Sequence, residues 1–354
     1  MASTITRLQH VITADKTTLK LNAAASSLPA VPTPAKKGGL LASLPPSLVP
    51  YAELMRLHQP AGVYASLVPT LIGLFLAAAS PKLTPSSISR ISPLTLLTIT
   101  ITHIVGNTLL RGAACAYNDA IDAPYDRLVA RCKSRPVARG AVTSLQAHMF
   151  ALPVFGLWIV TLFTLPSPET VVAPAALLTA TMGIYPFCKR ITHFPQLVLG
   201  ISLALAQAIG YGSLGVSFSN TDLPTQIGLG CLYVSYVVHT MIYDTVYAHQ
   251  DLEDDLKAGI LSMAVLCRGR TKVVLSRLAA VEVGLLAATG WTLGLEGPSY
   301  RVGAVGGTAM ALGTMVKSVR LDEPKNCRMW FARLLWWMGA CVVGGLAGEY
   351  WLRV

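Results

Sequence analysis

Two acidic clusters lie beside hydrophobic stretches of this chain that are long enough to cross a bilayer. The first is the segment NDAIDAPYD at 118–126, and the second is DLEDD at 251–255. An ionised carboxylate at membrane depth is costly, so a chain that retains this many is expected to use them. The two clusters are therefore the residues best placed to do chemistry.

The spacing within each cluster indicates metal binding. Asn118, Asp122 and Asp126 are spaced four residues apart, and Asp251 and Asp255 repeat that spacing. Residues four apart lie on one face of a helix, so each cluster presents a row of oxygen ligands. Mg²⁺ prefers one or two carboxylates plus substrate phosphates to a closed all-protein cage. The sequence thus predicts a magnesium site that takes a diphosphate substrate.

Basic residues follow the same stretches and are candidates for binding the diphosphate. The segment YPFCKR places Tyr185 four residues before Lys189, with Arg190 next to it. The segment RLVARCKSRP at 127–136, directly after the first cluster, contributes Arg135. An arginine can grip phosphate oxygens with a bidentate fork. The alternative for both segments is a basic flank that anchors a membrane span.

A third polar segment leads into the second acidic cluster. Asp244, Tyr247 and Asp251 are spaced so that they share one helical face. Asp244 is either part of the site or a structural acid with its own partner. A lone histidine such as His249 is more often a residue on the polar face of a helix than a catalytic base.

The composition is that of an integral membrane protein whose environment is the lipid bilayer. Hydrophobic residues make up 53% of the 354 residues and charged residues only 13%, against roughly 25% in ordinary globular domains. The net charge of +11 suggests nucleic acid, but the basic residues lie in short segments between apolar stretches, so no nucleic-acid partner is predicted. The 7 cysteines are scattered singly and support neither a zinc site nor a disulfide framework.

Apolar runs predict an all-α bundle of about nine transmembrane helices. No internal repeat and no long polar block interrupt them, so residues 46–354 are expected to form one domain. The predicted spans are 62–79, 94–117, 146–165, 170–187, 196–218, 227–247, 274–293, 302–317 and 332–350.

The distribution of basic residues predicts the orientation. With nine spans, one side of the membrane holds most of the lysines and arginines, and the other holds only Lys82, Arg90, Arg301 and Arg353. By the positive-inside rule, both acidic clusters then face the cytosol or its topological equivalent.

Residues 1–45 are expected to form a flexible cytosolic arm. They contain a single acid, Asp15, and end in a Pro/Ala/Gly-rich stretch. A mitochondrial transit peptide is the alternative, although such peptides are usually richer in arginine than this one, which has only Arg7. We therefore expect the endoplasmic reticulum or a related endomembrane rather than the mitochondrial inner membrane.

Taken in order, these motifs resemble those of the UbiA-type aromatic prenyltransferases. NDAIDAPYD matches the family's NDxxDxxxD, YPFCK its YxxxK, YAHQDLEDD its YAxxDxxDD, and RLHQPAG at 56–62 its first-helix RxxxPxG. The set covers most of the chain. The wording of RLHQPAG, SRPVARG and YAHQDLEDD is most similar to fungal meroterpenoid farnesyltransferases and next to the 4-hydroxybenzoate polyprenyltransferases of ubiquinone synthesis.

The resemblance implies a helical bundle around a central cavity in which Mg²⁺ bridges the acidic motifs and a prenyl diphosphate, with farnesyl diphosphate as the expected donor. The prenyl group would be transferred to a carbon of an aromatic acceptor, a hydroxylated aromatic acid or pyrone. The implied metal ligands are Asn118, Asp122, Asp126, Asp251 and Asp255. The implied catalytic residues are the four aspartates of that set together with Tyr185 and Lys189. Arg135, Lys189 and Arg190 are implied diphosphate contacts.

One position departs from the family pattern. Many members continue the second motif as GxKS, whereas this chain has Leu261 in place of the lysine. The role of that lysine is either unfilled here or passed to Lys257.

The remaining alternatives belong to other functional classes. A secondary transporter also has many spans and intramembrane acids, but it needs broken helices and usually an internal repeat, neither of which is evident. A terpene cyclase would share the acids and the Mg²⁺ chemistry and would need no acceptor. The CDP-alcohol phosphotransferases carry a DGxxAR element that this chain lacks.

Overall fold

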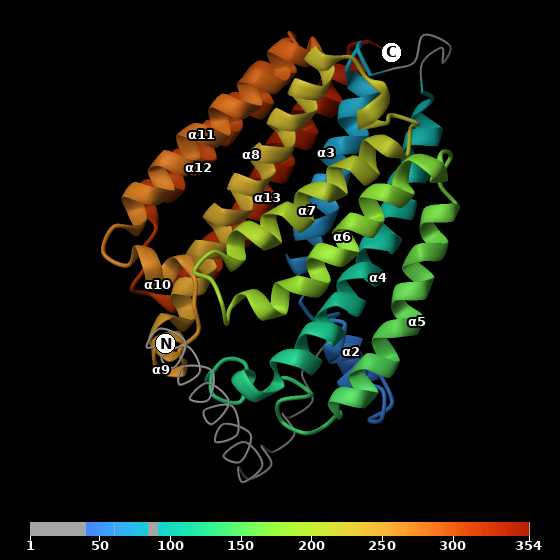
Figure 1. Ribbon diagram of the computed structural model, residues 1–354. Coiled ribbons are helices and arrows are strands. Elements are labelled where there is room, and N and C mark those ends of the chain that lie inside the picture. The colour runs from blue at the N-terminus through green and yellow to red at the C-terminus, as the bar shows by residue number, and fades with distance from the viewer. Residues whose placement is uncertain (1–39, 60, 84–90, 354) are drawn as a thin grey trace, which may run out of the picture.

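The computed structural model describes residues 40–59, 61–83 and 91–353, and within them every regular element is helical (Figure 1). The prediction of an all-α fold is confirmed. The elements are η1 (Leu40–Ser43), α2 (Val49–Leu54), α3 (Ala61–Ala79), α4 (Pro93–Asp126), α5 (Ser144–Phe163), α6 (Pro168–Cys188), α7 (Pro195–Gly212), η2 (Phe218–Asn220), α8 (Leu223–Ala248), η3 (His249–Asp251), α9 (Leu252–Ala258), α10 (Met263–Cys267), α11 (Thr271–Leu293), η4 (Ser299–Gly306), α12 (Gly307–Ser318) and α13 (Pro324–Trp351).

Seven helices of the described chain are long and apolar enough to cross a membrane, so the predicted count of nine is not confirmed. They are α3, α4, α5, α6, α7, α11 and α13. The predicted spans 227–247 and 302–317 fall on α8 and on η4 with α12. Helix α8 is long but carries polar residues such as His239 and Asp244, and the later run divides into a π-helix of 8 residues and an α-helix of 12.

The long helices pack side by side into one bundle. Helix α7 contacts α3, α6 and α8, while α4 packs against α5, and α13 packs against α3 and α12. Helices α3 and α7 approach closely because each contributes a glycine that faces the backbone of the other helix. A Cβ atom added at Gly73 would collide with the carbonyl of Gln207, and one added at Gly210 would collide with the carbonyl of Thr70. Such small-residue contacts are typical of helix packing in membranes.

The ends of the bundle differ in chemistry. Figure 1 shows the α4–α5 loop at one end and the α7–α8 loop at the other. The first acidic cluster lies at the end that carries the α4–α5 loop, in the last turns of α4. The second cluster lies at the same end, in η3 and α9, which follow α8. One mouth of the bundle therefore gathers both acidic clusters and the basic 127–139 segment.

This arrangement predicts the membrane orientation. A protease site inserted in the 127–139 loop is expected to be cut from the cytosolic face of sealed vesicles, whereas one inserted at 219–224 should be protected, because the basic loop stays on the cytosolic side. Detergent permeabilisation should expose both sites and serves as the control. Cleavage of the 219–224 site alone in intact vesicles would contradict this orientation.

The predicted flexible arm at 1–45 lies almost entirely outside the described residues, since the described chain begins at residue 40. The assignment of 46–354 to a single domain stays a prediction.

Candidate active site

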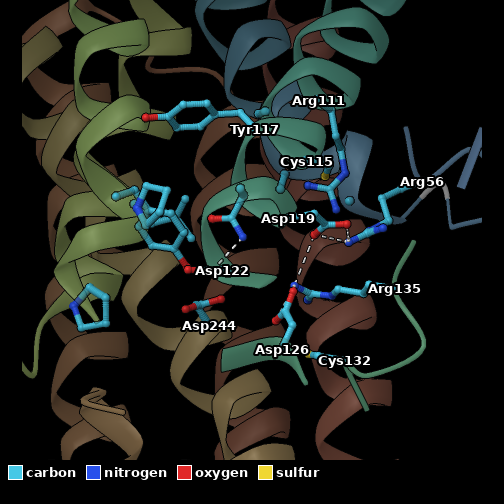
Figure 2. Close-up of a pocket in the computed structure, with 18 of the residues that line it drawn as sticks. Arg56, Arg111, Cys115, Tyr117, Asp119, Asp122, Asp126, Cys132, Arg135 and Asp244 are labelled. Atoms are coloured by element: carbon cyan, nitrogen blue, oxygen red, sulfur yellow. Dashed lines mark hydrogen bonds and ion pairs between the residues drawn. The ribbon is translucent and has the colours of Figure 1, made fainter. Parts of the chain in front are cut away.

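A cavity of about 1810 Å³ opens among the helices and contains both acidic clusters. Its polar end includes residues of α4, of the loop after α4, and of α8, η3 and α9 (Figure 2). Its remaining wall is largely apolar and includes Leu110, Phe155, Leu178, Met182, Leu199, Leu203 and Trp336. The cavity therefore offers a charged end beside an apolar chamber.

The first cluster occupies the last turns of α4, which continues through Pro124 to Asp126. A proline within a helix leaves the carbonyl four residues earlier without its usual donor. Here that carbonyl, of Ala120, accepts a hydrogen bond of 3.1 Å from the hydroxyl of Ser144. The first residue of α5 thus compensates for the proline, and the acidic face of α4 stays intact up to Asp126.

All three predicted ligands of the first cluster line the cavity. Asp122 and Asp126 are nearly buried, with 4% and 6% of their surfaces exposed. The side-chain amide of Asn118 donates to Oδ2 of Asp122 over 2.9 Å. The predicted four-residue spacing therefore does place these three groups together.

The second cluster follows a different backbone path from the predicted one. Asp251 ends the 3₁₀ turn η3, and Asp255 lies in the short helix α9, so a bend separates them where one continuous helix was expected. Both still line the cavity. Burial, and then repulsion from Asp251, raises the pKa of Asp255 to about 7. A cation bound at this end would favour the ionised form of Asp255.

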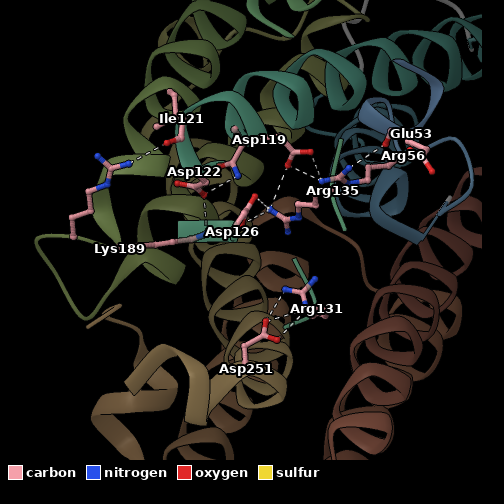
Figure 3. A network of polar contacts seen from close by, with 12 residues as sticks. Glu53, Arg56, Asp119, Ile121, Asp122, Asp126, Arg131, Arg135, Lys189 and Asp251 are labelled. Atoms are coloured by element: carbon pink, nitrogen blue, oxygen red, sulfur yellow. Dashed lines mark hydrogen bonds and ion pairs between the residues drawn. The ribbon is translucent and has the colours of Figure 1, made fainter. Parts of the chain in front are cut away.

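Each of three candidate ligand carboxylates pairs with a different basic residue (Figure 3). Lys189 lies 3.3 Å from Asp122. Arg135 lies 2.8 Å from Asp126, and Arg131 lies 2.6 Å from Asp251. These cations come from the loop after α4 and from the end of α6, and they surround the space that the acids line. The same groups can therefore attract an anion.

The loop after α4 connects the two clusters. Besides the pairing of Arg131 with Asp251, the backbone N–H of Ala130 donates to Oδ2 of Asp254 over 3.1 Å. The guanidinium of Arg131 also lies 5.1 Å from the centre of the Tyr247 ring. The basic segment thus packs onto the second cluster as well as following the first.

The predicted residues at the end of α6 lie at the same site. Tyr185 lines the cavity, and the ammonium of Lys189 lies 5.5 Å from the centre of its ring. Arg190 donates to the carbonyl of Ile121 over 3.3 Å and stacks 4.7 Å from the centre of the Tyr125 ring. Arg190 therefore holds α6 against α4 while also lining the cavity.

The departure at Leu261 is visible in the structure. Leu261 lines the cavity, and its backbone N–H donates to the carbonyl of Lys189 over 2.9 Å. Lys257 is exposed and is absent from the lining formed by the described residues. The structure thus places an apolar side chain next to Lys189, and it does not support a transfer of the missing lysine's role to Lys257.

The donor set fits Mg²⁺ bound jointly with a substrate. No three His, Cys, Asp or Glu side chains within the described ranges converge closely enough to hold a metal on their own. This agrees with the preference of Mg²⁺ for one or two carboxylates, substrate phosphates and water. The cavity is lined by oxygen ligands of the kind that a hard cation prefers. They belong to Asn118, Asp122, Asp126, Asp251 and Asp255.

Asp119 is a site residue that sequence reasoning did not assign. Its carboxylate has 1% of its surface exposed and accepts two hydrogen bonds of 2.7 Å from Arg56. It also lies 3.4 Å from Arg135. Arg56 has a φ of 56°, a backbone conformation that costs a non-glycine residue about 1–3 kcal/mol. The signal in the sequence was the RLHQPAG motif, which begins with this arginine.

Because Asp119 holds two arginines, its replacement should act on stability. We expect Asp119→Asn to lower the free energy of unfolding by about 3 kcal/mol, since breaking a buried ion pair leaves charges without a partner. Thermal unfolding of the detergent-solubilised protein measures this, with the exposed Asp322→Asn as the matched control. Unchanged stability in Asp119→Asn would show that the two arginines find other partners.

Comparison with known proteins agrees with this geometry. The model of the UbiA prenyltransferase family matches residues 66–339. Prenyltransferase stbC of Stachybotrys bisbyi is 35% identical over 81% of this chain and 83% of its own length. DMOA farnesyltransferase nvfB of Aspergillus novofumigatus is 34% identical over 90% of this chain and 96% of its own. The mitochondrial 4-hydroxybenzoate polyprenyltransferase of Saccharomyces cerevisiae is 34% identical over 83% of this chain and 74% of its own.

A solved structure supports the fold. A homolog from Archaeoglobus fulgidus, bound to GPP and Mg²⁺, superposes with a TM-score of 0.62 over 84% of this chain and 99% of its own. At 16% identity, this likeness concerns the architecture of the helices.

Proposed function

This chain belongs to the UbiA prenyltransferase family, and on that premise we propose that it transfers a farnesyl group from its diphosphate to a ring carbon of a hydroxylated aromatic acid or pyrone. It is an integral membrane prenyltransferase, and we place it in the endoplasmic reticulum or a related endomembrane. The observation that carries the proposal is the meeting of two acidic clusters and three ion-paired cations at one end of a largely apolar cavity.

The charged end is suited to a leaving diphosphate. Bound there by the two acidic clusters, Mg²⁺ would supply positive charge that neutralises the departing group. Lys189, Arg131 and Arg135 are already turned toward the acids and can exchange carboxylate oxygens for phosphate oxygens. Such preorganised cations stabilise charge that develops during the reaction.

The apolar chamber is suited to the prenyl tail. Burial contributes roughly 0.8 kcal/mol per methylene, so leucine, phenylalanine and methionine side chains can hold the tail without polar contacts. The same walls exclude water from an allylic cation, which would otherwise react with it. An electron-rich ring would attack the cation, and its ring proton would then leave to a base. Tyr185 and Asp244 line the cavity and are candidates, and the released diphosphate is a third.

A second candidate function is prenylation of 4-hydroxybenzoate with a much longer polyprenyl diphosphate. The identity of 34% with the yeast 4-hydroxybenzoate polyprenyltransferase supports it. The farnesyl proposal has the additional support of the wording of the motifs and of nvfB, whose name states a farnesyl donor. The two candidates differ in the donor used and in the organelle where the protein resides.

Labelled farnesyl diphosphate tests the proposal. Membranes that contain the chain should release diphosphate only when both Mg²⁺ and a phenolic acid are added, because transfer needs both substrates. Membranes carrying Asp126→Asn, with one candidate ligand neutralised, are the control. Release without an acceptor would indicate a cyclase or a hydrolase, and use of only longer donors would favour the ubiquinone-type reaction.

A further inference from the structure

Four exposed basic residues near the junction of α10 and α11 have no acidic partner within the described chain. The members of this α10–α11 patch are Arg268, Arg270, Lys272 and Arg277. None of the ion pairs formed by the described residues includes any of them. The chain has no acid between Asp255 and Glu282, and the segments outside the described residues add only Asp15. The patch is therefore a cluster of positive charge that the protein itself leaves largely uncompensated.

The basic residues at the cavity are different, although they lie at the same end of the bundle. There each of five cations pairs with an acid, and these cations are Arg56, Arg131, Arg135, Arg139 and Lys189. No member of the α10–α11 patch is among the described residues that line the cavity. The diphosphate that we propose for the cavity is therefore not the anion that the patch meets.

Apolar side chains are exposed between these cations. Leu266 on α10 is 49% exposed, and Val273 and Val281 on α11 are 54% and 50% exposed. Exposed apolar side chains gain nothing from water, whereas a bilayer interface offers an apolar phase and a charged phase side by side. The mixture of exposed valine or leucine with arginine and lysine thus matches the boundary between acyl chains and headgroups.

Arg277 carries the patch onto the outer face of α11. Helix α11 runs along the edge of the bundle, where it packs against α8 and α12 (Figure 1). Val273, Arg277 and Val281 follow each other at four-residue spacing and are all exposed, so they share the outward face. Arg277 lies about 9 Å along the axis from Thr271, where α11 begins. A guanidinium between two lipid-facing valines needs a counter-charge, because an unpaired charge is costly in a bilayer.

We propose that the α10–α11 patch binds the headgroup of an anionic phospholipid, with Arg277 on the phosphate and the three loop cations on the further negative charge. A planar guanidinium matches two phosphate oxygens with parallel hydrogen bonds. The arginine side chain reaches toward the headgroups while its methylenes stay on apolar surface. The acyl chains of the lipid lie along the valines of α11.

The membrane supplies this ligand on the side that the orientation predicts. The patch lies at the same end of the bundle as the 127–139 loop, which we expect to face the cytosol (Figure 1). Anionic lipids are concentrated in the cytoplasmic leaflet, and each Lys or Arg near them strengthens binding about 5-fold. A soluble phosphate compound shares the charge but has no acyl chains for Val273, Val281 and Leu266 to contact.

Native mass spectrometry of the full-length protein in detergent tests the proposal by counting bound lipids. Wild-type protein should bind dioleoylphosphatidylserine about 100-fold more tightly than dioleoylphosphatidylcholine, because three loop cations act on the additional negative charge. The triple variant Arg268→Gln/Arg270→Gln/Lys272→Gln should lose this preference. Arg277→Gln should weaken the binding of both lipids about 5-fold, since both carry the phosphate, and Arg277→Lys should recover part of it.

A matched control and a soluble competitor complete the design. Arg301→Gln removes an exposed arginine from the opposite end of the bundle and should bind lipid as the wild type does. Glycerophosphoserine, which lacks acyl chains, should not displace the bound lipid, and all variants should share the Tm of the lipid-free wild type. Equal binding of both lipids by the wild type, an unchanged preference in the triple variant, displacement by glycerophosphoserine, or a lowered lipid-free Tm in Arg277→Gln would each overturn the proposal. The readout needs no turnover, so its result is independent of the proposed prenyl transfer.

Discussion

Replacing Asp122 or Asp251 with asparagine is expected to abolish prenyl transfer while the protein stays folded in the membrane. Each substitution removes one anionic ligand from a different acidic cluster, and Mg²⁺ needs such ligands together with the diphosphate oxygens. Loss of one group that stabilises developing charge typically lowers kcat about 100- to 1,000-fold, and loss of a metal should equal or exceed this.

Folding should survive because the cations left behind, Lys189 and Arg131, have 33% and 36% of their side-chain surfaces exposed and can be hydrated, whereas the two arginines held by Asp119 have only 12% and 21% exposed. Purified Asp122→Asn and Asp251→Asn are to be compared by product formation and by thermal unfolding, with the exposed Asp322→Asn as a control for the loss of one aspartate. A wild-type rate in either variant would refute the assignment of that cluster to the metal. Asp119→Asn provides the contrast, since its main expected effect is on stability.

Removal of Mg²⁺ by EDTA should stop turnover completely, and excess Mg²⁺ should restore it. Without Mg²⁺ the carboxylates of the cavity would repel the diphosphate. Lys189, Arg131 and Arg135 would then stay paired with these carboxylates and would not be free to neutralise the leaving group. Turnover measured before chelation, after it and after the return of Mg²⁺ tests this directly.

The same treatment should leave the fold in place. Within the described ranges no three His, Cys, Asp or Glu side chains converge to hold a metal, so we expect the packing of the helices not to depend on one. The Tm in EDTA should therefore match that of the untreated protein without substrate. Undiminished turnover in EDTA would contradict the role of the metal.

Apolar run length predicted most of the bundle. The predicted spans 62–79 and 146–165 correspond to α3 (Ala61–Ala79) and α5 (Ser144–Phe163), because a continuous stretch that must satisfy its backbone in lipid forms a helix. Helix α4 continues beyond the predicted span 94–117 through the first acidic cluster to Asp126, and Ser144 compensates there for Pro124. A hydrogen bond from the next helix is not visible in the local sequence.

The site shows the same division between local and distant causes. The four-residue spacing of Asn118, Asp122 and Asp126 predicted a shared face correctly, since all of them lie within one helix. The same rule was wrong about the helix that carries Asp251 and Asp255, because the chain bends at η3.

Partners from distant segments were beyond sequence reasoning. Asp119 and Arg56 are separated by 63 positions in the chain. Arg131 and Asp251 are separated by 120 positions. A pattern along the chain does not tell which charges remain without a partner.

The bond formed in the product tests the central claim most directly. Purified protein with farnesyl diphosphate, a hydroxylated aromatic acid and Mg²⁺ should give one product, which mass spectrometry and NMR identify as the acid with a farnesyl group on a ring carbon ortho to a hydroxyl. Omitting any one of the three components should abolish that product. An O-farnesyl ether, or a cyclised hydrocarbon formed without the acid, would contradict the account.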